Sequence, residues 1–344
     1  MTHHTPIHAD ELDRARSILT TIVGAYDRKV VGQHSLRTSL LAALVAGGHV
    51  LLESVPGLAK TTAAESIAEA VHASFKRIQC TPDLLPSDII GTQIYDARTG
   101  GFQTQLGPVH ANFVLLDEVN RSSAKTQSAM LEAMQERQTS IGGVNYALPK
   151  PFFVLATQNP IEQEGTYQLP EAQLDRFLLK EVLSYPTIGE EAEIVRRVNA
   201  GVYDEPVVPD APDDGSAERP SHPHVTVEDV LFLQALAKRV YLDPSILNYI
   251  VQTVYVTRHA RDYLSPRLAS YIEYGASPRA SIAFSTVARS LAILAGRDHV
   301  IPEDVKSYRH QVLRHRIILN FEAAADDVGP ETIIDAVFAA VQAP

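Results

Sequence analysis

The chain has 344 residues, 45% of them hydrophobic, which is enough for about two domains with sizeable cores. Its formal net charge of −11 argues against a general grip on DNA or RNA, because that grip needs a basic face. Cys80 is the single cysteine, which excludes intramolecular disulfides and thiolate zinc clusters and fits a reducing cytosol. We find neither a secretory signal nor an apolar run that could span a bilayer, so a cytoplasmic protein is expected.

The first part of the chain has the pattern of an α/β domain. Helical spacing of apolar residues predicts a helix over 9–28, and a second helix ends at Gly47. Continuous apolar runs then alternate with helical or loop segments, which indicates a parallel sheet covered on both faces. Ligands of such sheets bind at the carboxyl ends of the strands, so the residues after each run are the functional candidates. The runs cover residues 49–53, 75–80, 112–118, 152–157 and 177–182.

Two segments interrupt this alternation. Residues 92–105 alternate around Gly100, and residues 139–153 contain the pair Gly142 and Gly143 between extended segments. Both patterns predict β-hairpins that project from the sheet.

The second part of the chain is helical. Residues 201–224 are rich in proline and acid and are expected to form a linker or surface loop. The expected organisation is therefore an α/β domain over 1–200 and a helical domain over 225–344. The predicted helices of the second domain cover residues 226–239, 243–258, 278–296 and 302–313, with a last helix after Pro330.

The stretch LLESVPGLAKTT, residues 51–62, is the first candidate for a functional site. Lys60 and Thr61 match the end of the phosphate-binding pattern G-x-x-x-x-G-K-S/T, but Ser54 and Ala59 replace both of its glycines. The context supports the pattern, since the loop follows an apolar strand and precedes a helix, where backbone N–H groups point at a bound anion. We interpret the replacements as tolerated variants: Ala59 needs only helical dihedrals if the helix begins there, and Ser54 places a side chain at the strand exit.

Each residue of the loop has an expected task. Pro56 and Gly57 supply a sharp turn, because proline fixes φ and glycine allows a positive φ. Lys60 is expected to reach the terminal phosphates of a nucleotide, and Thr61 to hold Mg²⁺.

Two further strand ends carry polar residues. The run FVLLDE ends a buried strand with Asp117 and Glu118. A buried acid is costly unless a charge meets it, and Mg²⁺ on Thr61, approached by Asp117 through water, meets that cost. Glu118 is then placed to polarise an attacking water, and Asn159, after the next strand, to orient that water. Three such signals in order favour a nucleotide-hydrolysing site over an ordinary α/β domain with polar loop ends.

Longer stretches of the sequence resemble a known family. In them the chain is similar to the MoxR family of AAA+ ATPases, over nearly its whole length except the amino-terminal tail and the acidic loop. Alanine before the loop lysine is usual in that family, whereas Ser54 departs from its usual glycine. The stretches are GGHVLLESVPGLAKT, FKRIQCTPDLLPSDIIGTQIYD, LLDEVNR, LEAMQERQ, FFVLATQNPIEQEGTYQLPEAQLDRFLL, GASPRAS and PEDVKSYRHQVLRHRI.

The resemblance implies a fold and a set of nucleotide contacts. The fold is an AAA+ P-loop parallel sheet with helices on both faces, followed by a small all-α lid domain, and the two hairpins are family inserts. Gly32 and Gln33 are implied at the adenine, and Asp117 at the metal with Thr61. The phosphate loop contributes Pro56, Gly57, Leu58, Ala59, Lys60, Thr61 and Thr62.

The resemblance also makes Arg176 an arginine finger. Arg176 lies just before the last strand, so we expect it to project to a subunit edge and to complete the active site of a neighbour. Subunits that depend on one another in this way form a closed ring. The alternative is an ion pair with a nearby carboxylate such as Asp175 or Glu171.

By the same resemblance, Arg279 is the second sensor, carried by the helical domain. A cation at a helix start is unfavourable with the helix dipole, and a bound phosphate relieves this, whereas the alternative is a solvent-facing helix start. We expect Arg279 and Lys60 to hold the phosphates of ATP bound between the two domains. Arg121 and Arg137 are candidates for contacts across the subunit boundary, with plain surface charge as the alternative.

The resemblance implies an ATP-hydrolysing remodelling ATPase of chaperone type, working as a ring of six subunits with ATP and Mg²⁺. Its implied partners are a protein client and a von Willebrand factor A-domain protein, and its task is to mature another protein complex. Hydrolysis is expected to move the helical domain against the sheet domain as a hinge.

Three alternatives stay open at this point. The first is a nucleic-acid-dependent AAA+ motor, against which the acidic balance argues. It is considered because related AAA+ rings with similar inserts act on DNA. The basic run at 309–316 is a candidate nucleic-acid site, but we expect that run to pack on acidic neighbours. The second is a magnesium-chelatase-like ATPase subunit. The third is a scaffold that binds ATP and scarcely turns it over, which Ser54 motivates.

Overall fold

The computed structural model describes residues 6–55, 57–160, 167, 169–203 and 225–344. Pro56 and nearly all of the expected acidic loop lie outside the described residues.

A five-stranded sheet forms the centre of the first domain. Its strand order is β2-β5-β8-β1-β9, and every neighbouring pair is parallel, which confirms the sheet expected from the apolar runs. The strands are β1 (Val50–Glu53), β2 (Phe75–Gln79), β5 (Phe113–Asp117), β8 (Phe153–Gln158) and β9 (Leu179–Val182).

Helices cover both faces of the sheet. Side chains of a strand point alternately to its two faces, so Val50 and Leu52 pack into one hydrophobic cluster and Leu51 into the other. Helices α1 (Ala9–Lys29), α2 (His34–Ala46) and α3 (Lys60–Ala70) contribute to the first cluster, and α4 (Pro86–Ile90) and α5 (Ala124–Glu136) contribute to the second. Two further helices, α6 (Glu171–Leu174) and α7 (Ile188–Asn199), flank β9, the last strand of this sheet in chain order.

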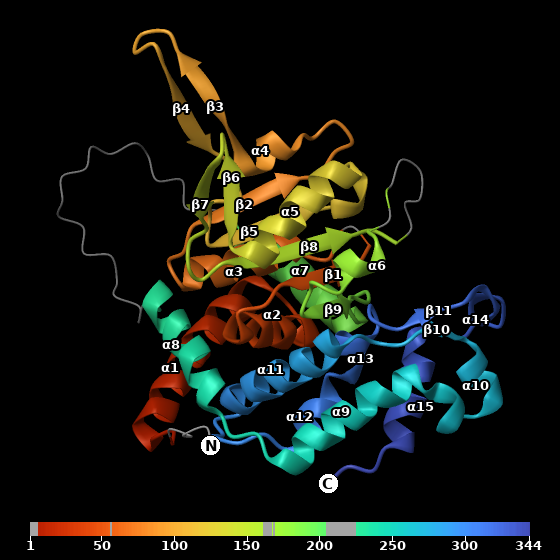
Figure 1. The fold of residues 1–344 in the computed structure, drawn as a ribbon. Helices are drawn as coiled ribbons and strands as arrows, with labels where there is room; N and C mark the ends of the chain where they lie inside the picture. Colours follow the sequence, from red (N-terminus) through yellow and green to blue (C-terminus); the bar gives the residue numbers. More distant parts are fainter. Residues whose placement is uncertain (1–5, 56, 161–166, 168, 204–224) are drawn as a thin grey trace.

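Two antiparallel hairpins interrupt the alternation of strands and helices. Strands β3 (Gly91–Asp96) and β4 (Gly101–Leu106) pair along their whole length and project away from the sheet at the end of the molecule opposite the helical domain (Figure 1). Strands β6 (Gln138–Ile141) and β7 (Val144–Ala147) form a shorter hairpin. It ends at Ala147, whereas the sequence pattern predicted a hairpin up to residue 153.

The helical lid domain follows the sheet domain. Its long helices agree with the sequence pattern except that the helix expected over 302–313 is divided at Tyr308, whose ring is buried against α2. Its helices are α8 (Val227–Arg239), α9 (Pro244–Arg258), α10 (Pro266–Ser270), α11 (Pro278–Leu294), α12 (Pro302–Ser307), α13 (Arg309–Leu313), α14 (Phe321–Ala325) and α15 (Pro330–Ala340), with two short strands, β10 (Ile272–Tyr274) and β11 (Ile318–Leu319).

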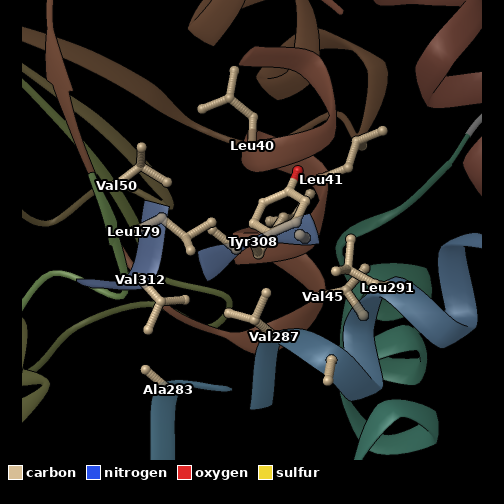
Figure 2. Packing of buried hydrophobic residues seen from close by; sticks show 14 of the residues in the cluster. Leu40, Leu41, Val45, Val50, Leu179, Ala283, Val287, Leu291, Tyr308 and Val312 are labelled. Atoms are coloured by element: carbon tan, nitrogen blue, oxygen red, sulfur yellow. The ribbon is translucent and has the colours of Figure 1, made fainter. Parts of the chain in front are cut away.

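The lid and one face of the sheet share a single hydrophobic core. Figure 2 shows Leu40 and Val45 of α2, Val287 of α11 and Tyr308 gathered around the same interior. Helix α2 therefore lies between the sheet and the lid and belongs to the cores of both.

The basic run at 309–316 packs on acidic neighbours, as expected. Asp335 accepts hydrogen bonds from both Arg309 and His310, at 2.6 and 2.8 Å. Arg314 pairs with Glu331 at 3.1 Å.

Among the described residues, no helix is both long enough and apolar enough to cross a membrane.

Candidate nucleotide site

The phosphate loop leaves β1 at the carboxyl edge of the sheet and enters α3 at Lys60. Ser54 does not disturb the strand exit, because its backbone N–H continues the ladder by donating to the Gln158 carbonyl at 3.2 Å. Its side chain is buried, and no described residue bonds to its hydroxyl oxygen. Gly57 has a φ of 84°, which glycine alone adopts at little cost.

Ala59 corrects one expectation from the sequence. It has φ 53° and ψ 29° and is therefore left-handed, so the loop does not enter the helix there with helical dihedrals. A side chain in this conformation costs roughly 1–2 kcal/mol, which explains why the general pattern has glycine at this position.

Asp117 is the last residue of β5 and Glu118 follows it, and both are hydrogen-bonded to one buried threonine hydroxyl. Asp117 is 8% exposed and accepts a hydrogen bond from the Thr157 hydroxyl at 2.8 Å. The same hydroxyl oxygen accepts the backbone N–H of Glu118 at 2.8 Å, while Glu118 has a φ of 57°. Thr157 is fully buried in the adjacent strand β8, so it fixes the end of β5 from one side.

Cationic and amide groups from the edge strand engage the two acids. Arg77 of β2 donates to the second Asp117 oxygen at 2.5 Å. Gln79 donates to Glu118 at 3.1 Å, and Arg121 pairs with the same Glu118 oxygen at 3.2 Å. Arg121, a candidate for a contact across the subunit boundary, is thus bound to Glu118 of its own chain.

Asn159 follows the end of β8, one residue beyond Gln158, and is 6% exposed. The pairing of β5 with β8 continues in register up to Leu116 and Ala156, so Asn159 and Glu118 leave neighbouring strands at the same edge. The structure therefore brings Lys60, Asp117, Glu118 and Asn159 to one edge of the sheet.

A cavity of about 230 Å³ adjoins the phosphate loop. Gln33 donates to the Ser184 carbonyl at 3.3 Å, and a Cβ on Gly32 would overlap with the Glu190 carboxylate, so glycine is required for this close approach. No described residue of the lid lines this cavity, so the cavity does not support the expectation that ATP lies between the two domains. The lining residues are Lys29, Val31, Gln33, Gly57, Leu58, Ala59, Thr62, Pro186, Ile194 and Tyr203.

A second cavity, of about 330 Å³, lies at the opposite, amino-terminal edge of the sheet. It is lined by the turn before β1, by the end of α5 and by the first turn of α11. Arg176 and Arg279 both line it, together with Arg137, Arg316 and the single carboxylate of Asp175. We call this the arginine pocket.

Arg279 therefore lies away from Lys60 of its own chain, contrary to the expectation that both hold the same phosphates. The four residues of β1 separate the edges by about 13 Å, at 3.3 Å per residue. Arg137 has a structural task within the pocket, since it donates to the carbonyls of Phe152 and Gly47. The Nε of Arg176 is buried without a hydrogen-bond partner among the described residues.

Sequence reasoning missed several residues of these two sites. Thr157 is a polar residue at the end of an otherwise apolar run, which was the one signal for its role. Arg77 and Gln79 alternate with apolar residues on an edge strand and look like surface positions. Asp175 and Arg316 are brought together by the fold, at 2.8 Å, from positions far apart in the chain.

Comparisons with known proteins agree with this geometry. A model of the ATPase family associated with various cellular activities (AAA) matches residues 49–179, and a model of the AAA lid domain matches residues 264–337. The chain is 46% identical to Chaperone MoxR1 of Mycobacterium tuberculosis, over 92% of this chain and 80% of that one. It is 30% identical to Protein MoxR of Methylorubrum extorquens, with 92% of each covered. A crystal structure of a proposed ATPase from Cytophaga hutchinsonii has a TM-score of 0.86 at 43% identity, with 97% of each chain covered.

A parallel phosphate-loop sheet followed by a helical lid, matched by both family models, defines an AAA+ ATPase. Within that class, the chain belongs to the MoxR family, as its similarity to named members over nine-tenths of its length shows. It is a chaperone-like ATPase that binds and hydrolyses ATP. The fold class and the enzyme class expected from the sequence are both confirmed.

The left-handed Ala59 generates a prediction on stability. Ala59→Gly removes the steric penalty of an alanine in the left-handed backbone conformation, which raises stability. Glycine also increases the entropy of the unfolded chain, which lowers stability by a smaller amount. The melting temperature should therefore stay equal or rise. The matched control is Ala64→Gly in the regular part of α3, which should lose roughly 1 kcal/mol or more. Differential scanning calorimetry measures both. A fall for Ala59→Gly as large as for the control would contradict the strain.

The Thr157 hydroxyl generates a prediction on metal dependence. Thr157→Val leaves the Asp117 oxygen and the Glu118 N–H without a partner, at a cost of roughly 1–3 kcal/mol for each buried group. We expect the Mg²⁺ concentration for half-maximal ATPase activity to rise, because Asp117 is no longer held in place. Thr253→Val is the control, since that equally buried hydroxyl bonds only to its own helix. An unchanged Mg²⁺ titration for Thr157→Val would reject the role.

Proposed function

We propose that this protein is an ATP-driven ring that remodels a protein client, together with a von Willebrand factor A-domain protein, to mature another protein complex. The observation that carries the proposal is the division of the catalytic groups between two edges of one sheet. Lys60, Asp117 and Glu118 lie at the carboxyl edge, and Arg176 and Arg279 lie at the other. A subunit with this arrangement needs a neighbour to complete its site.

At the carboxyl edge, each residue has a role suited to its position. Lys60 and the backbone N–H groups that begin α3 bind the phosphates, where the helix dipole favours negative charge. Glu118 accepts a hydrogen bond from the attacking water and so increases its nucleophilicity, and Asn159 orients that water. Glu118 is held by Gln79 and Arg121, so activation of the water requires it to exchange these contacts.

The oxygen donors at this edge fit magnesium. Mg²⁺ prefers oxygen ligands and usually takes one or two protein ligands, with phosphates and water completing its shell. Thr61 in the first turn of α3 and the buried Asp117 would hold it, and no described group of three or more His, Cys, Asp or Glu side chains competes as a metal site. Bound there, the ion supplies charge neutralisation for the phosphates. Arg77, which contacts Asp117 in its place, must then move aside.

At the amino-terminal edge, Arg176 and Arg279 together serve the ATP of the adjoining subunit. An arginine that contacts the transferred phosphoryl group increases the rate of hydrolysis by roughly 10³–10⁵-fold. We therefore expect the loss of either arginine to inactivate the ring. Head-to-tail contacts that close produce such a ring, and six subunits is the number that we propose, in the cytosol.

The β3–β4 hairpin is the surface that we propose for the client. Four of its apolar side chains are exposed by between 48% and 69%, and two of these, Tyr95 and Phe102, stack edge to face. Contiguous exposed apolar groups mark contacts with other proteins. Their position at the far end of the molecule keeps them clear of the lid (Figure 1). The four are Ile94, Tyr95, Phe102 and Leu106.

Mixing of inactive subunits tests the shared site. Glu118→Gln should bind ATP and not hydrolyse it, while Arg176→Ala and Arg279→Ala should each be inactive alone. In an equal mixture of Glu118→Gln with either arginine variant, about a quarter of the contacts in a heterologous ring pair an intact catalytic edge with intact arginines. We therefore expect ATPase activity to return to about that fraction of the wild-type rate.

The two arginine mixtures separate the alternatives for Arg279. If Arg279 acted within its own subunit, Arg279→Ala would stay inactive in the mixture while Arg176→Ala recovered. If neither mixture recovered activity and both still assembled, the shared site would be wrong.

Affinity capture tests the partners. Tagged Glu118→Gln with ATP should retain a protein client and a von Willebrand factor A-domain protein, because the ring is held before hydrolysis. Lys60→Ala, which cannot hold ATP, is the control and should retain neither. Mass spectrometry of the two samples identifies the difference. ATPase activity that rises on addition of DNA, with a steep salt dependence, would instead indicate a nucleic-acid motor.

A further inference from the structure

The carboxylate of Asp175 links the segment that carries Arg176 to the lid, which carries Arg279. Asp175 directly precedes Arg176 in the chain and is largely buried, with its side chain 17% exposed. It accepts hydrogen bonds from the Ser277 hydroxyl and from the Arg316 Nε, both at 2.8 Å. Arg279, two residues after Ser277, reaches the same carboxylate at 3.9 Å. Asp175 is therefore adjacent to Arg176 in the chain and is also in contact with Arg279 and with Ser277, which begins the helix of Arg279.

Arg316 strengthens this junction from the lid side. Its side chain is 3% exposed, so the charge is removed from water and needs compensation from the protein. Its guanidinium donates to the carbonyls of Phe177 and Leu178, in addition to Asp175. The backbone on both sides of Arg176 is thus bound to one lid residue, while Arg176 itself lines the cavity.

We propose that Asp175, together with Arg316, is a positioning residue that presents Arg176 and Arg279 as one unit to the ATP of the adjoining subunit. The proposal rests on the proposed function, in which both arginines act on a neighbour. The carboxylate compensates the buried Arg316 and fixes the spacing between two guanidiniums that would otherwise repel each other. The finger segment is then held by the lid as well as by the sheet.

The molecule offers a matched control for this junction. Asp229 pairs with Arg14 at 2.8 Å and has a side chain that is 18% exposed, so it resembles Asp175 in type, distance and burial. That pair also joins the lid to the first domain, through α8 and α1, and does not line the arginine pocket. Asp229→Asn therefore removes an aspartate of similar burial that also joins the lid to the first domain, although its partner Arg14 is 56% exposed, and it does not touch the arginines.

Asp175→Asn is the test. A displacement of about 1 Å of a catalytic group costs on the order of 10²-fold in rate, so we expect kcat of the assembled ring to fall 10- to 100-fold. The KM for ATP should change less than about twofold, since the groups that bind the nucleotide lie at the other edge. Asp229→Asn should leave both constants near wild type.

Subunit mixing gives a readout that a merely structural defect would not move. Asp175→Asn keeps its own catalytic edge, so Glu118→Gln subunits, which supply intact arginines, should raise the activity of the mixture well above that of either variant alone. No such rise, or a kcat equal to that of Asp229→Asn, would overturn the proposal. If Arg176→Ala also failed to recover with Glu118→Gln, the proposed function would have failed instead.

A milder variant covers the case in which Asp175→Asn does not fold, because it leaves the buried Arg316 charge uncompensated. Ser277→Gly deletes the hydroxyl that reaches Asp175, and glycine is nearly as good as serine at a helix start. We expect a two- to fivefold fall in kcat with an unchanged KM. When Glu118→Gln subunits are mixed in, the rate per intact catalytic edge should rise, although the total rate is diluted by the inactive edges. A Ser277→Gly ring with wild-type kcat would reject the junction.

Discussion

The direction of a parallel sheet is the constraint on which the site depends. All carboxyl ends of the strands meet at one edge, so the phosphate loop, Asp117, Glu118 and Asn159 converge there although they are far apart in the chain. By the same geometry, any residue that precedes a strand lies at the other edge. Arg176 precedes β9 and cannot reach the phosphates that its own Lys60 binds. The mutual dependence of subunits that we propose is consistent with this strand direction.

The position of the lid follows from packing rather than from the nucleotide. Leu40 and Val45 of α2 and Val287 of α11 share one buried core, and each such side chain contributes about 1.5–3 kcal/mol when fully buried. Moving the lid as a hinge against its own sheet would break many of these contacts at once. The hinge expected from the sequence is therefore disfavoured. In the ring that we propose, motion driven by hydrolysis would meet less resistance at the boundary between subunits than between the lid and its own sheet.

Sequence patterns predicted the sheet, the hairpins' general positions and the carboxyl-edge residues because these depend on local signals, namely apolar runs, turn residues and the polar residues at strand ends. They did not predict where Arg279 lies, because its helix comes after a long connection and its docking depends on contacts between residues more than two hundred positions apart. Nor did they predict the left-handed Ala59, since alanine carries no turn signal. Thr157 was overlooked for a related reason: its hydroxyl gains a role only when β5 and β8 are paired.

The two edges also differ in how firmly their groups are held. Glu118 and Asp117 are bound to side chains of their own domain that a nucleotide and its metal must displace, namely Gln79, Arg121 and Arg77. The arginine pocket has the opposite character, because Arg316 and Asp175 satisfy each other while the Nε of Arg176 has no hydrogen-bond partner among the described residues. The acids of one edge are therefore held by side chains of their own domain, whereas at the other edge one guanidinium nitrogen is buried without a hydrogen-bond partner among the described residues. In the ring that we propose, the edge with fewer internal contacts would engage a neighbour with less rearrangement than the edge at Glu118 requires.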